Sequence, residues 1–279
     1  MSPITRETSI HPTAIVEKGA QLGIGVRIGP FCHVSGEAVL EDGVELLGHV
    51  TVMGATTLGS GTQVYPGAVL GAPPQNFKHK GGPTVLTVGS NNVIREGVTF
   101  HRGTDTSRGK TTVGNNGLFM AYCHVAHDCD VGNNVTMANY SGLGGHAEIG
   151  DFVIISGYAA VHQFVRIGHH AFLAGFAAVV GDVIPYGMAV GDRAKLRGLN
   201  VIGMKRAGMS RAELTEIRSA YRMLFAPDQP LSANIQRVER EFPQSALVAE
   251  MLRFIGDRQR RHLTVPPLGA GDDADDDTE

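Results

Sequence analysis

The sequence has no tryptophan, only three cysteines, and aromatic residues that make up 6% of its 279 residues. Three cysteines are too few for a disulfide scaffold. No apolar run approaches the length of a membrane span, and the first twenty residues do not resemble a signal peptide. These absences predict a cytoplasmic protein without a membrane span.

A strong net charge is also missing. The 24 basic and 27 acidic residues give a net charge of −3, which provides no global attraction to nucleic acid or to an anionic membrane. We therefore expect neither as a partner. What the chain has in excess is glycine, with 37 residues and no collagen period, and such an excess calls for a search for internal repeats.

A repeat of six residues runs through most of the chain. Every sixth residue from Ile10 to Leu70 is aliphatic, and the same pattern returns at Val88 and then runs from Val113 to Val179 with an apolar residue at each step. A small or β-branched residue follows four positions later in most units. This is the hexapeptide repeat of a parallel β-helix, in which three units close one triangular coil of 18 residues. Such coils stack about 4.8 Å apart through backbone hydrogen bonds.

Two polar segments, 71–87 and 100–112, interrupt this repeat. Long insertions in a solenoid are more often functional than decorative. The hexads stop after Pro185. We therefore predict a β-helix domain over 1–190, a helical domain over 191–265, and an acidic, disordered tail over 266–279.

Helix signals follow the solenoid. Ser210 and Glu213 have the spacing of a capping box and open a helix that is expected to run to about Phe225. Prolines separate it from a second helix near 232–241, and a third is expected over about 245–255. Between residues 192 and 225 there are eight basic and three acidic residues, which favours a docking patch for an acidic protein over a merely solvated helix face.

The cysteines and histidines fall at different positions of the repeat. Cys32, Cys123 and Cys129 occupy small, inward-facing positions, so they are expected to fill the core. His127, His146 and His162 leave remainders of 1, 2 and 0 when their numbers are divided by 18, so they should line one edge over three successive coils. His124 precedes the same corner, whereas His169 and His170 fall on a different face.

A cluster of imidazoles supports two chemistries. Three neutral rings can bind Zn²⁺ and leave a position for water, as in hexapeptide-type carbonic anhydrases. Alternatively, one ring is a general base and the others bind substrate. The carboxylate of Asp128 would orient the neighbouring ring of His127. No well-placed serine or cysteine nucleophile accompanies the cluster, which favours direct transfer over an acyl-enzyme.

The segment HVAHDCD, from His124 to Asp130, resembles the catalytic segment of UDP-N-acetylglucosamine O-acyltransferases, the family of the first enzyme of lipid A synthesis. The similarity covers the chain from Ile10 to about Phe225. It includes the further motifs Gly144-Gly145-His146, Ala160-Val161-His162-Gln163-Phe164, Ile94-Arg95-Glu96 and His101-Arg102-Gly103-Thr104.

This resemblance implies a mainly β fold, namely a left-handed parallel β-helix of hexapeptide repeats with a C-terminal α-helical cap. The handedness rests on the resemblance, because the general rule for crossovers between parallel strands predicts a right-handed helix. The implied reaction moves a 3-hydroxyacyl chain from acyl carrier protein to a UDP-linked amino sugar, with neither a cofactor nor a metal. Flat walls and contact-rich insertions predict a homotrimer.

The resemblance also implies roles for single residues. His127 would be the base that deprotonates the 3-position of the sugar, with Asp128 as its partner, and the backbone N–H of Gly145 would stabilise the thioester oxyanion. Gly175 would set the acyl-chain length, with Arg193 as the second candidate. The residues implied in substrate binding are His124, His146, His162, Gln163, Asn200 and Arg206, together with Gln75 and Lys78 from a neighbouring subunit.

Three positions depart from the family. Ile202 and Ala207 replace a glutamate and an arginine that often contact the nucleotide, and Asn76 stands where the family usually has aspartate. A carboxylate beside the acceptor would favour the ammonium form of a 3-amino group, which has no lone pair for attack, and an amide removes that bias. The acceptor is therefore either the ordinary 3-hydroxyl or the 3-amino analogue. A zinc hydratase, an acetyl-CoA-dependent acetyltransferase and a purely structural β-helix are the competing interpretations.

Overall fold

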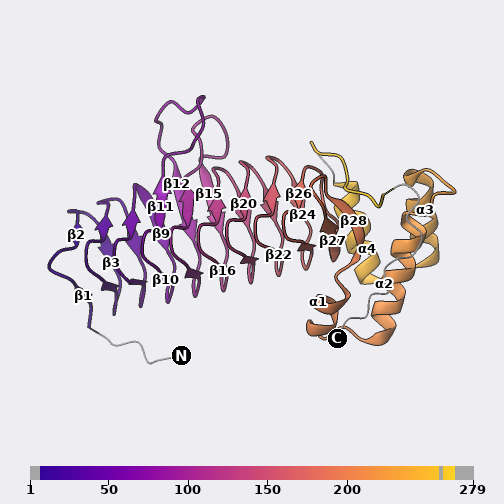
Figure 1. Cartoon of the computed structure of the whole chain (residues 1–279), viewed down its shortest axis with the longest axis horizontal. Coiled ribbons are helices and arrows are strands. Elements are labelled where there is room, and N and C mark those ends of the chain that lie inside the picture. Colours follow the sequence, from indigo (N-terminus) through magenta and orange to yellow (C-terminus); the bar gives the residue numbers. More distant parts are fainter. Residues whose placement is uncertain (1–6, 258–259, 268–279) are drawn as a thin grey trace.

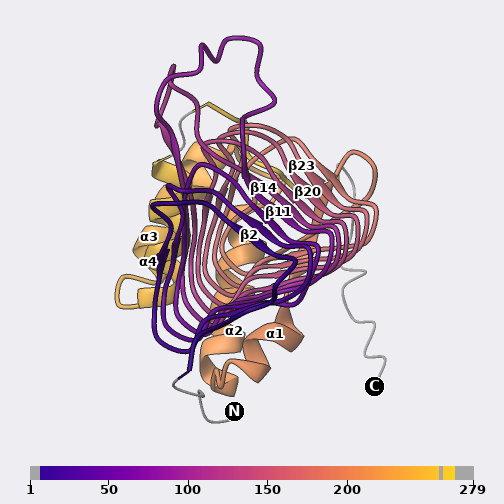
Figure 2. The ribbon, with the colours of Figure 1, turned by 90° about the vertical axis from the view of Figure 1, so that its left-hand side faces the viewer.

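The computed structural model describes residues 7–257 and 260–267. Its main body is a long triangular prism of short parallel strands, with a pair of loops projecting from one edge and helices gathered at one end (Figure 1). Seen from the N-terminal end, the chain winds counter-clockwise as it recedes, which is the left-handed sense (Figure 2). The expected left-handed parallel β-helix is confirmed, and its three walls are named sheets A, B and C below.

Each wall is built from every third strand. Sheet A holds β1 (Ser9–Ile10), β4 (Arg27–Ile28), β7 (Glu45–Leu46), β10 (Gln63–Val64), β13 (Val93–Ile94), β16 (Leu118–Phe119), β19 (Thr136–Met137), β22 (Ile154–Ile155), β25 (Phe172–Leu173), β27 (Gly187–Val190) and β28 (Lys195–Leu199). Sheet B holds β2 (Ile15–Val16), β5 (His33–Val34), β8 (Thr51–Val52), β11 (Val69–Ala72), β14 (Thr99–His101), β17 (His124–Val125), β20 (Gly142–Leu143), β23 (Ala160–Val161) and β26 (Ala178–Val179). Sheet C holds β3 (Gln21–Leu22), β6 (Val39–Leu40), β9 (Ala55–Leu58), β12 (Val85–Val88), β15 (Lys110–Val113), β18 (Asp130–Val131), β21 (Glu148–Ile149) and β24 (Arg166–Ile167).

The hexad register explains the core. The aliphatic position of each unit points inward, and from Ile28 to Val179 every one of these side chains is buried. The second inward position takes a small residue because little room is left near a corner. Cys32, Cys123 and Cys129 occupy it, and all three are buried and free. Burial raises the pKa of Cys123 and Cys129 to about 12, which leaves both thiols protonated and confirms them as core residues.

The two insertions leave the prism at the corner between sheets B and C. The predicted bounds were too wide, because β12 already begins at Val85 and β15 at Lys110, and both strands pair in register with their neighbours in sheet C. The projecting loops are therefore 73–84 and 102–109.

Four helices follow the last coil: α1 (Val201–Arg206), α2 (Arg211–Leu224), α3 (Leu231–Glu241) and α4 (Ala246–Gly256). The capping box at Ser210 and Glu213 is present, as predicted. Two elements were not foreseen: β28, which runs antiparallel to β27, and the short helix α1. The segment 268–279 of the expected acidic tail lies outside the described residues. No helix in the described part of the chain is long and apolar enough to cross a membrane.

Candidate active site

Three successive coils place histidines on the corner between sheets B and C, directly beyond the projecting loops. We call the residues His127, His146 and His162 the histidine edge. The ring centroids of His127 and His146 lie 5.3 Å apart and nearly perpendicular. His162 comes from the next coil, after β23. The 18-residue spacing therefore predicted this edge correctly.

His127 and Asp128 form a hydrogen-bonded pair at the centre of the edge. Nδ1 of His127 lies 2.8 Å from Oδ2 of Asp128, whose side chain is completely buried. Thr104 holds the carboxylate from the other side: its backbone N–H donates to both oxygens at 3.1 and 3.2 Å, and its hydroxyl donates to Oδ2 at 2.7 Å. The backbone N–H of Asp128 donates to Thr111 Oγ1. The ring of His127 therefore faces a carboxylate that has little freedom to turn.

These contacts keep Asp128 ionised. Burial acts to raise its pKa, but the hydrogen bonds from His127 and Thr104 outweigh burial and hold the pKa of Asp128 below its usual value. An ionised carboxylate requires a proton on Nδ1 of His127 for their hydrogen bond. Nε2 is then the nitrogen with a free lone pair, and it is the atom that can accept a proton from a substrate.

Gly145 lies directly against the ring of His127. A Cβ atom at this position would come within 2.6 Å of ring atom Cε1, so the position requires glycine. The N–H of Gly145 has no hydrogen-bond acceptor among the residues that the structure describes. A backbone donor beside the candidate base has the placement that an oxyanion donor needs.

Two flanking histidines are held neutral. Burial lowers the pKa of His146, and the charges of His127, Arg260 and Arg108 add to this effect against the opposing charge of Asp128. Burial also lowers the pKa of His124, whose Nδ1 lies 2.7 Å from Thr99 Oγ1. Neutral imidazoles can offer hydrogen bonds to a substrate without competing for the proton that His127 is to accept.

The first loop reaches the histidine edge of its own chain. Nδ2 of Asn76 lies 3.4 Å from Nε2 of His127, which is the lone-pair nitrogen identified above. Gln75 and Lys78, on either side of it, are exposed. Asn76, which stands where the family usually has aspartate, therefore contacts the candidate base.

Four predicted residues lie elsewhere in the single chain. Asn200 caps α1 and donates to the carbonyl of His170, and Arg206 ends the same helix. In both views α1 lies on the side of the prism opposite the loops (Figures 1 and 2). Gly175 is exposed at the corner between sheets A and B, and Arg193 is exposed in the turn between β27 and β28. One chain thus does not bring these four residues to His127.

Among the residues that the structure describes, one group of side chains could hold a metal ion, namely His127, Asp128 and His146, whose ligand atoms lie within 4.8 Å of one another. It differs from the three-imidazole site expected for zinc, because His162 is not part of it. The carboxylate of Asp128 already accepts hydrogen bonds from His127 and Thr104, and a metal would have to displace them. The donor set therefore fits the general-base arrangement better than the zinc arrangement.

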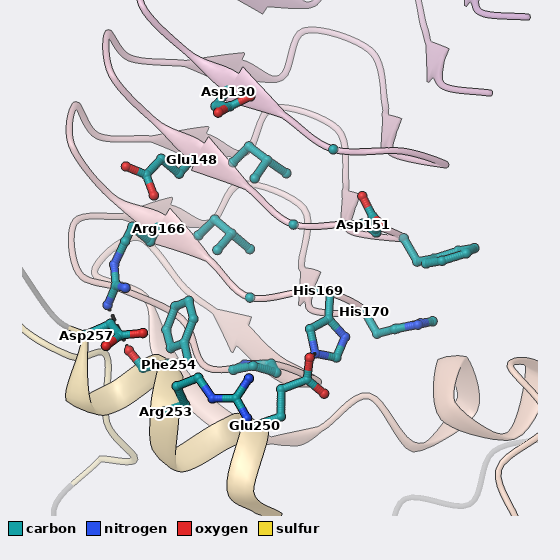
Figure 3. A pocket seen from close by; sticks show the side chains of 17 residues that line it. Asp130, Glu148, Asp151, Arg166, His169, His170, Glu250, Arg253, Phe254 and Asp257 are labelled. Carbon is teal, nitrogen blue, oxygen red and sulfur yellow. Dashed lines mark hydrogen bonds and ion pairs between the residues drawn. The ribbon is translucent and has the colours of Figure 1, made fainter. Parts of the chain in front are cut away.

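A hollow of about 740 Å³ lies between sheet C and α4 and is lined by none of the predicted site residues (Figure 3). Its polar groups largely tie the cap to the solenoid. The guanidinium of Arg166 binds Asp182 and the carbonyl of Phe254, and His169 Nε2 lies 2.8 Å from Glu250 Oε1. The interpretation of His169 as a residue outside the histidine edge is thus consistent with its place in this groove.

The sequence patterns did not predict a role for three residues that lie around the histidine edge. Thr104 was noted only as part of a motif. Arg260 and Arg261 arrive from beyond α4: the guanidinium of Arg260 lies 4.4 Å above the ring of Phe164, and Arg261 contacts His162 and Gln163. No repeat signal extends to this segment, so spacing could not place it.

A left-handed β-helix whose corner carries a supported His–carboxylate pair beside a free backbone donor defines an acyltransferase of the hexapeptide-repeat class. Comparisons with known proteins sharpen this assignment. Residues 182–263 match the family model described as UDP-N-acetylglucosamine O-acyltransferase, domain 2. The acyl-[acyl-carrier-protein]–UDP-N-acetylglucosamine O-acyltransferase of Mesorhizobium japonicum is 66% identical over 273 residues, covering 97% of this chain and 98% of that protein. The enzyme of the same description from Brucella ovis is 59% identical over 277 residues, covering 98% and 100%.

Solved structures agree with these relatives. The UDP-N-acetylglucosamine acyltransferase of Francisella novicida superimposes with a TM-score of 0.90 at 33% identity, covering 93% of this chain and 95% of that one. The Bacteroides fragilis enzyme gives a TM-score of 0.89 at 34% identity, covering 91% and 99%. The chain belongs to the family of acyl-[acyl-carrier-protein]–UDP-N-acetylglucosamine O-acyltransferases and is an acyltransferase.

Proposed function

We propose that this protein transfers a 3-hydroxyacyl chain from acyl carrier protein to the 3-position of UDP-N-acetylglucosamine, the first step of lipid A biosynthesis. The observation that carries the proposal is the supported His127–Asp128 pair beside the free N–H of Gly145. Nε2 of His127 takes the proton of the attacking group, and Asp128 stabilises the imidazolium that forms. The Gly145 N–H donates to the thioester oxygen as negative charge develops on it. The proton then passes to the departing thiolate of the donor.

The test is a mass analysis of the products formed from a mixed pool of 3-hydroxyacyl carriers and both acceptor sugars. A 3-O-acyl product with release of the free carrier thiol supports the proposal. Transfer from acetyl-CoA in preference to the carrier protein would contradict it. Full activity of protein washed with chelator is the further expectation that separates it from a zinc hydratase.

We also propose that the amide at Asn76 widens the choice of acceptor. Its side chain touches Nε2 of His127, so it lies beside the atom to be deprotonated. A carboxylate there would favour the ammonium form of a 3-amino sugar, whereas an amide does not. The experiment is competition between UDP-N-acetylglucosamine and its 3-amino analogue for one acyl carrier, repeated with Asn76→Asp. The aspartate variant should lose mainly the amide product, and an amine sugar that is inert with the parent protein would leave the 3-hydroxyl as the acceptor.

We further propose that the protein is a homotrimer, in which neighbouring subunits bring together the predicted site residues that lie far apart in one chain. The outward side chains of sheet B are small near the capped end, at Gly142, Ala160 and Ala178. Beside them a column of stacked, exposed rings follows the corner between sheets A and B; we call it the aromatic ladder, Tyr122, Tyr140, Tyr158 and Phe176. Packing this wall against a neighbour would cover the rings and bring α1 and Gly175 of one subunit toward the histidine edge of the next. A stable, active monomer in sedimentation would contradict the proposal.

Within this trimer Gly175 would lie at the bottom of the groove that binds the acyl chain. A Cβ there would lie 3.5 Å from the carbonyl oxygen of Gly157, an ordinary contact, so the backbone tolerates a side chain. Gly175→Met should then shift the preference toward shorter acyl chains by steric exclusion. An unchanged chain-length profile would favour Arg193 as the residue that sets the acyl-chain length.

A further inference from the structure

After α4 the chain returns to the solenoid and closes its last coil. We call residues 260–265 the C-terminal strap. The backbone of Asp182 forms two hydrogen bonds with the strap. Its N–H donates to the carbonyl of His262, and its carbonyl accepts from the N–H of Thr264, both at 2.8 Å. A Cβ at Gly181 would lie 2.7 Å from the carbonyl oxygen of His262, so this glycine gives the strap room to close. The strap is therefore a fixed part of the described structure.

The strap brings Arg261 onto the histidine edge. Its Nε donates to the carbonyl of Gln163 at 2.9 Å, and its Nη2 lies 2.7 Å from Nδ1 of His162. An arginine has donors but no acceptor, so Nδ1 of His162 must be the accepting nitrogen and the ring proton sits on Nε2. Arg261 thus turns His162 into a hydrogen-bond donor.

Arg260 adds a second positive charge next to it. Its guanidinium covers the ring of Phe164, which in turn stacks on His146 with centroids 4.3 Å apart. Arg108, near the same histidine, is neutralised by Asp130 at 3.1 Å. Within residues 7–257 and 260–267, no carboxylate forms an ion pair with Arg260 or Arg261. In the part of the chain that the structure describes, the capped end of the histidine edge therefore carries two guanidinium groups without a carboxylate partner, and one imidazole N–H.

We propose that Arg260 and Arg261 bind a phosphate ester of a substrate, namely the phosphodiester of the donor's pantetheine arm. This rests on the proposed function for the identity of the donor. The strap lies two to three coils from His127, about 10–14 Å along the edge at a coil spacing of about 4.8 Å. Under this proposal the arm of a thioester held at His127 lies along the edge toward the cap, where guanidinium groups bind phosphate with paired, charge-assisted hydrogen bonds.

The experiment compares two small donors that differ only in the phosphate, an S-(3-hydroxyacyl)-4′-phosphopantetheine and the corresponding S-acyl pantetheine. The parent protein should favour the phosphorylated donor in kcat/KM by about ten- to a hundredfold, the usual worth of hydrogen bonds to a charged group. The double variant Arg260→Gln, Arg261→Gln should bring this ratio close to one. Arg253→Gln, which removes an exposed arginine of α4 in the groove of Figure 3, should keep the parent ratio.

The ratio separates binding of phosphate from a structural role of the strap, because loss of the His162 contact alone would slow both donors equally. A parent ratio near one, or a double variant that retains the parent ratio, overturns the inference. If the ratio is retained while KM for the UDP-sugar rises, the phosphate belongs to the acceptor, and the assignment to the donor is wrong. Calorimetric titration with 4′-phosphopantetheine and pantetheine, neither of which reacts, tests the strap even if no acyl transfer is observed and the proposed function fails.

Discussion

The histidine edge and the aromatic ladder are two corners of one prism with the same backbone. Asp128 and His146 have φ values of 60° and 63°, and Tyr140 and Tyr158 both have φ of 60°, so each corner holds non-glycine residues in the left-handed region. This conformation is uncommon for a residue with a Cβ. At the ladder, the residues in this conformation stack their rings at about 5 Å. At the histidine edge, His146 also stacks on Phe164, but Asp128 is held by hydrogen bonds to Thr104 and Thr111.

The comparison shows which positions the repeat leaves free. Inward positions must fill a narrow core, and most of them are apolar or small, with Phe100 and Phe119 as the largest. Side chains at the corners do not have to pack into that core. One corner can therefore carry aromatic rings, and another can carry imidazoles and a carboxylate. The two loops contact the second corner, through Asn76 and Thr104, and leave the ladder exposed.

The largest expected difference between the corners is catalytic. His127→Ala should reduce turnover by about 10²–10⁴-fold, because it removes the proton acceptor and leaves the buried aliphatic core intact. The matched control is His170→Ala, which removes a histidine at the equivalent turn of a third corner, where it stacks between Phe152 and Tyr186. Steady-state rates with unchanged circular dichroism check the prediction, and near-normal activity of His127→Ala would rule out His127 as the base.

The second largest expected difference is the effect on kcat of adding a methyl group to a glycine at each corner. Gly145→Ala places a Cβ 2.6 Å from the ring of His127 and must push it away from Asp128 or Asn76, so we expect a loss of about 10²-fold in kcat. Gly157→Ala, beside the ladder, meets its nearest atom at 3.4 Å and should leave kcat close to the parent value. Equal effects of the two substitutions would mean that the contact between Gly145 and His127 does not position the ring.

The support behind the carboxylate gives a smaller expected effect. Thr104→Val keeps the size and the backbone N–H of the residue but removes the hydroxyl that donates to Asp128 at 2.7 Å. A hydrogen bond to a charged group is worth about 1.5–3 kcal/mol, so kcat should fall by about tenfold or somewhat more. Thr104→Ser retains the donor and should restore most of the rate. A serine variant as slow as the valine variant would show that the methyl group, and not the hydrogen bond, is what matters.

The sequence predicted those parts of the molecule that follow the repeat. The core positions from Ile28 to Val179, the cysteines and the alignment of His127 with His146 all follow from a period of six residues and coils of 18, because each coil repeats the one before it. The capping box at Ser210 was also predictable, since it depends on two residues three positions apart.

Contacts outside the repeat were not predictable in this way. The fold of the first loop, which sets Asn76 against His127, is decided by local turns that no period describes. The contact between Arg261 and His162 joins residues 99 positions apart through a segment that follows four helices. The hydrogen bonds from Thr104 to Asp128 likewise cross from a loop to a corner. Spacing locates what stacks, whereas these contacts depend on how irregular segments return to the stack.

The smallest expected effect concerns acid stability, which should again differ between the corners. His101 is buried at the base of the second loop, edge-on to His124, and burial lowers its pKa from 6.5 to about 4, helped by the charges of His124 and His127. Between these two pH values the unfolded chain binds a proton that the folded chain excludes. The stabilising contribution of the neutral ring is therefore complete above pH 6.5 and is lost as the pH drops toward 4 and below, by at most about 3.4 kcal/mol at 1.36 kcal/mol per pKa unit. Urea unfolding midpoints across this range measure the slope. His101→Asn should flatten it even if that variant is less stable at pH 7, whereas His11→Asn, at an exposed position, should not. A slope unaffected by His101→Asn would assign the acid sensitivity to the other buried imidazoles of this corner, His124 and His146, whose pKa values are also lowered.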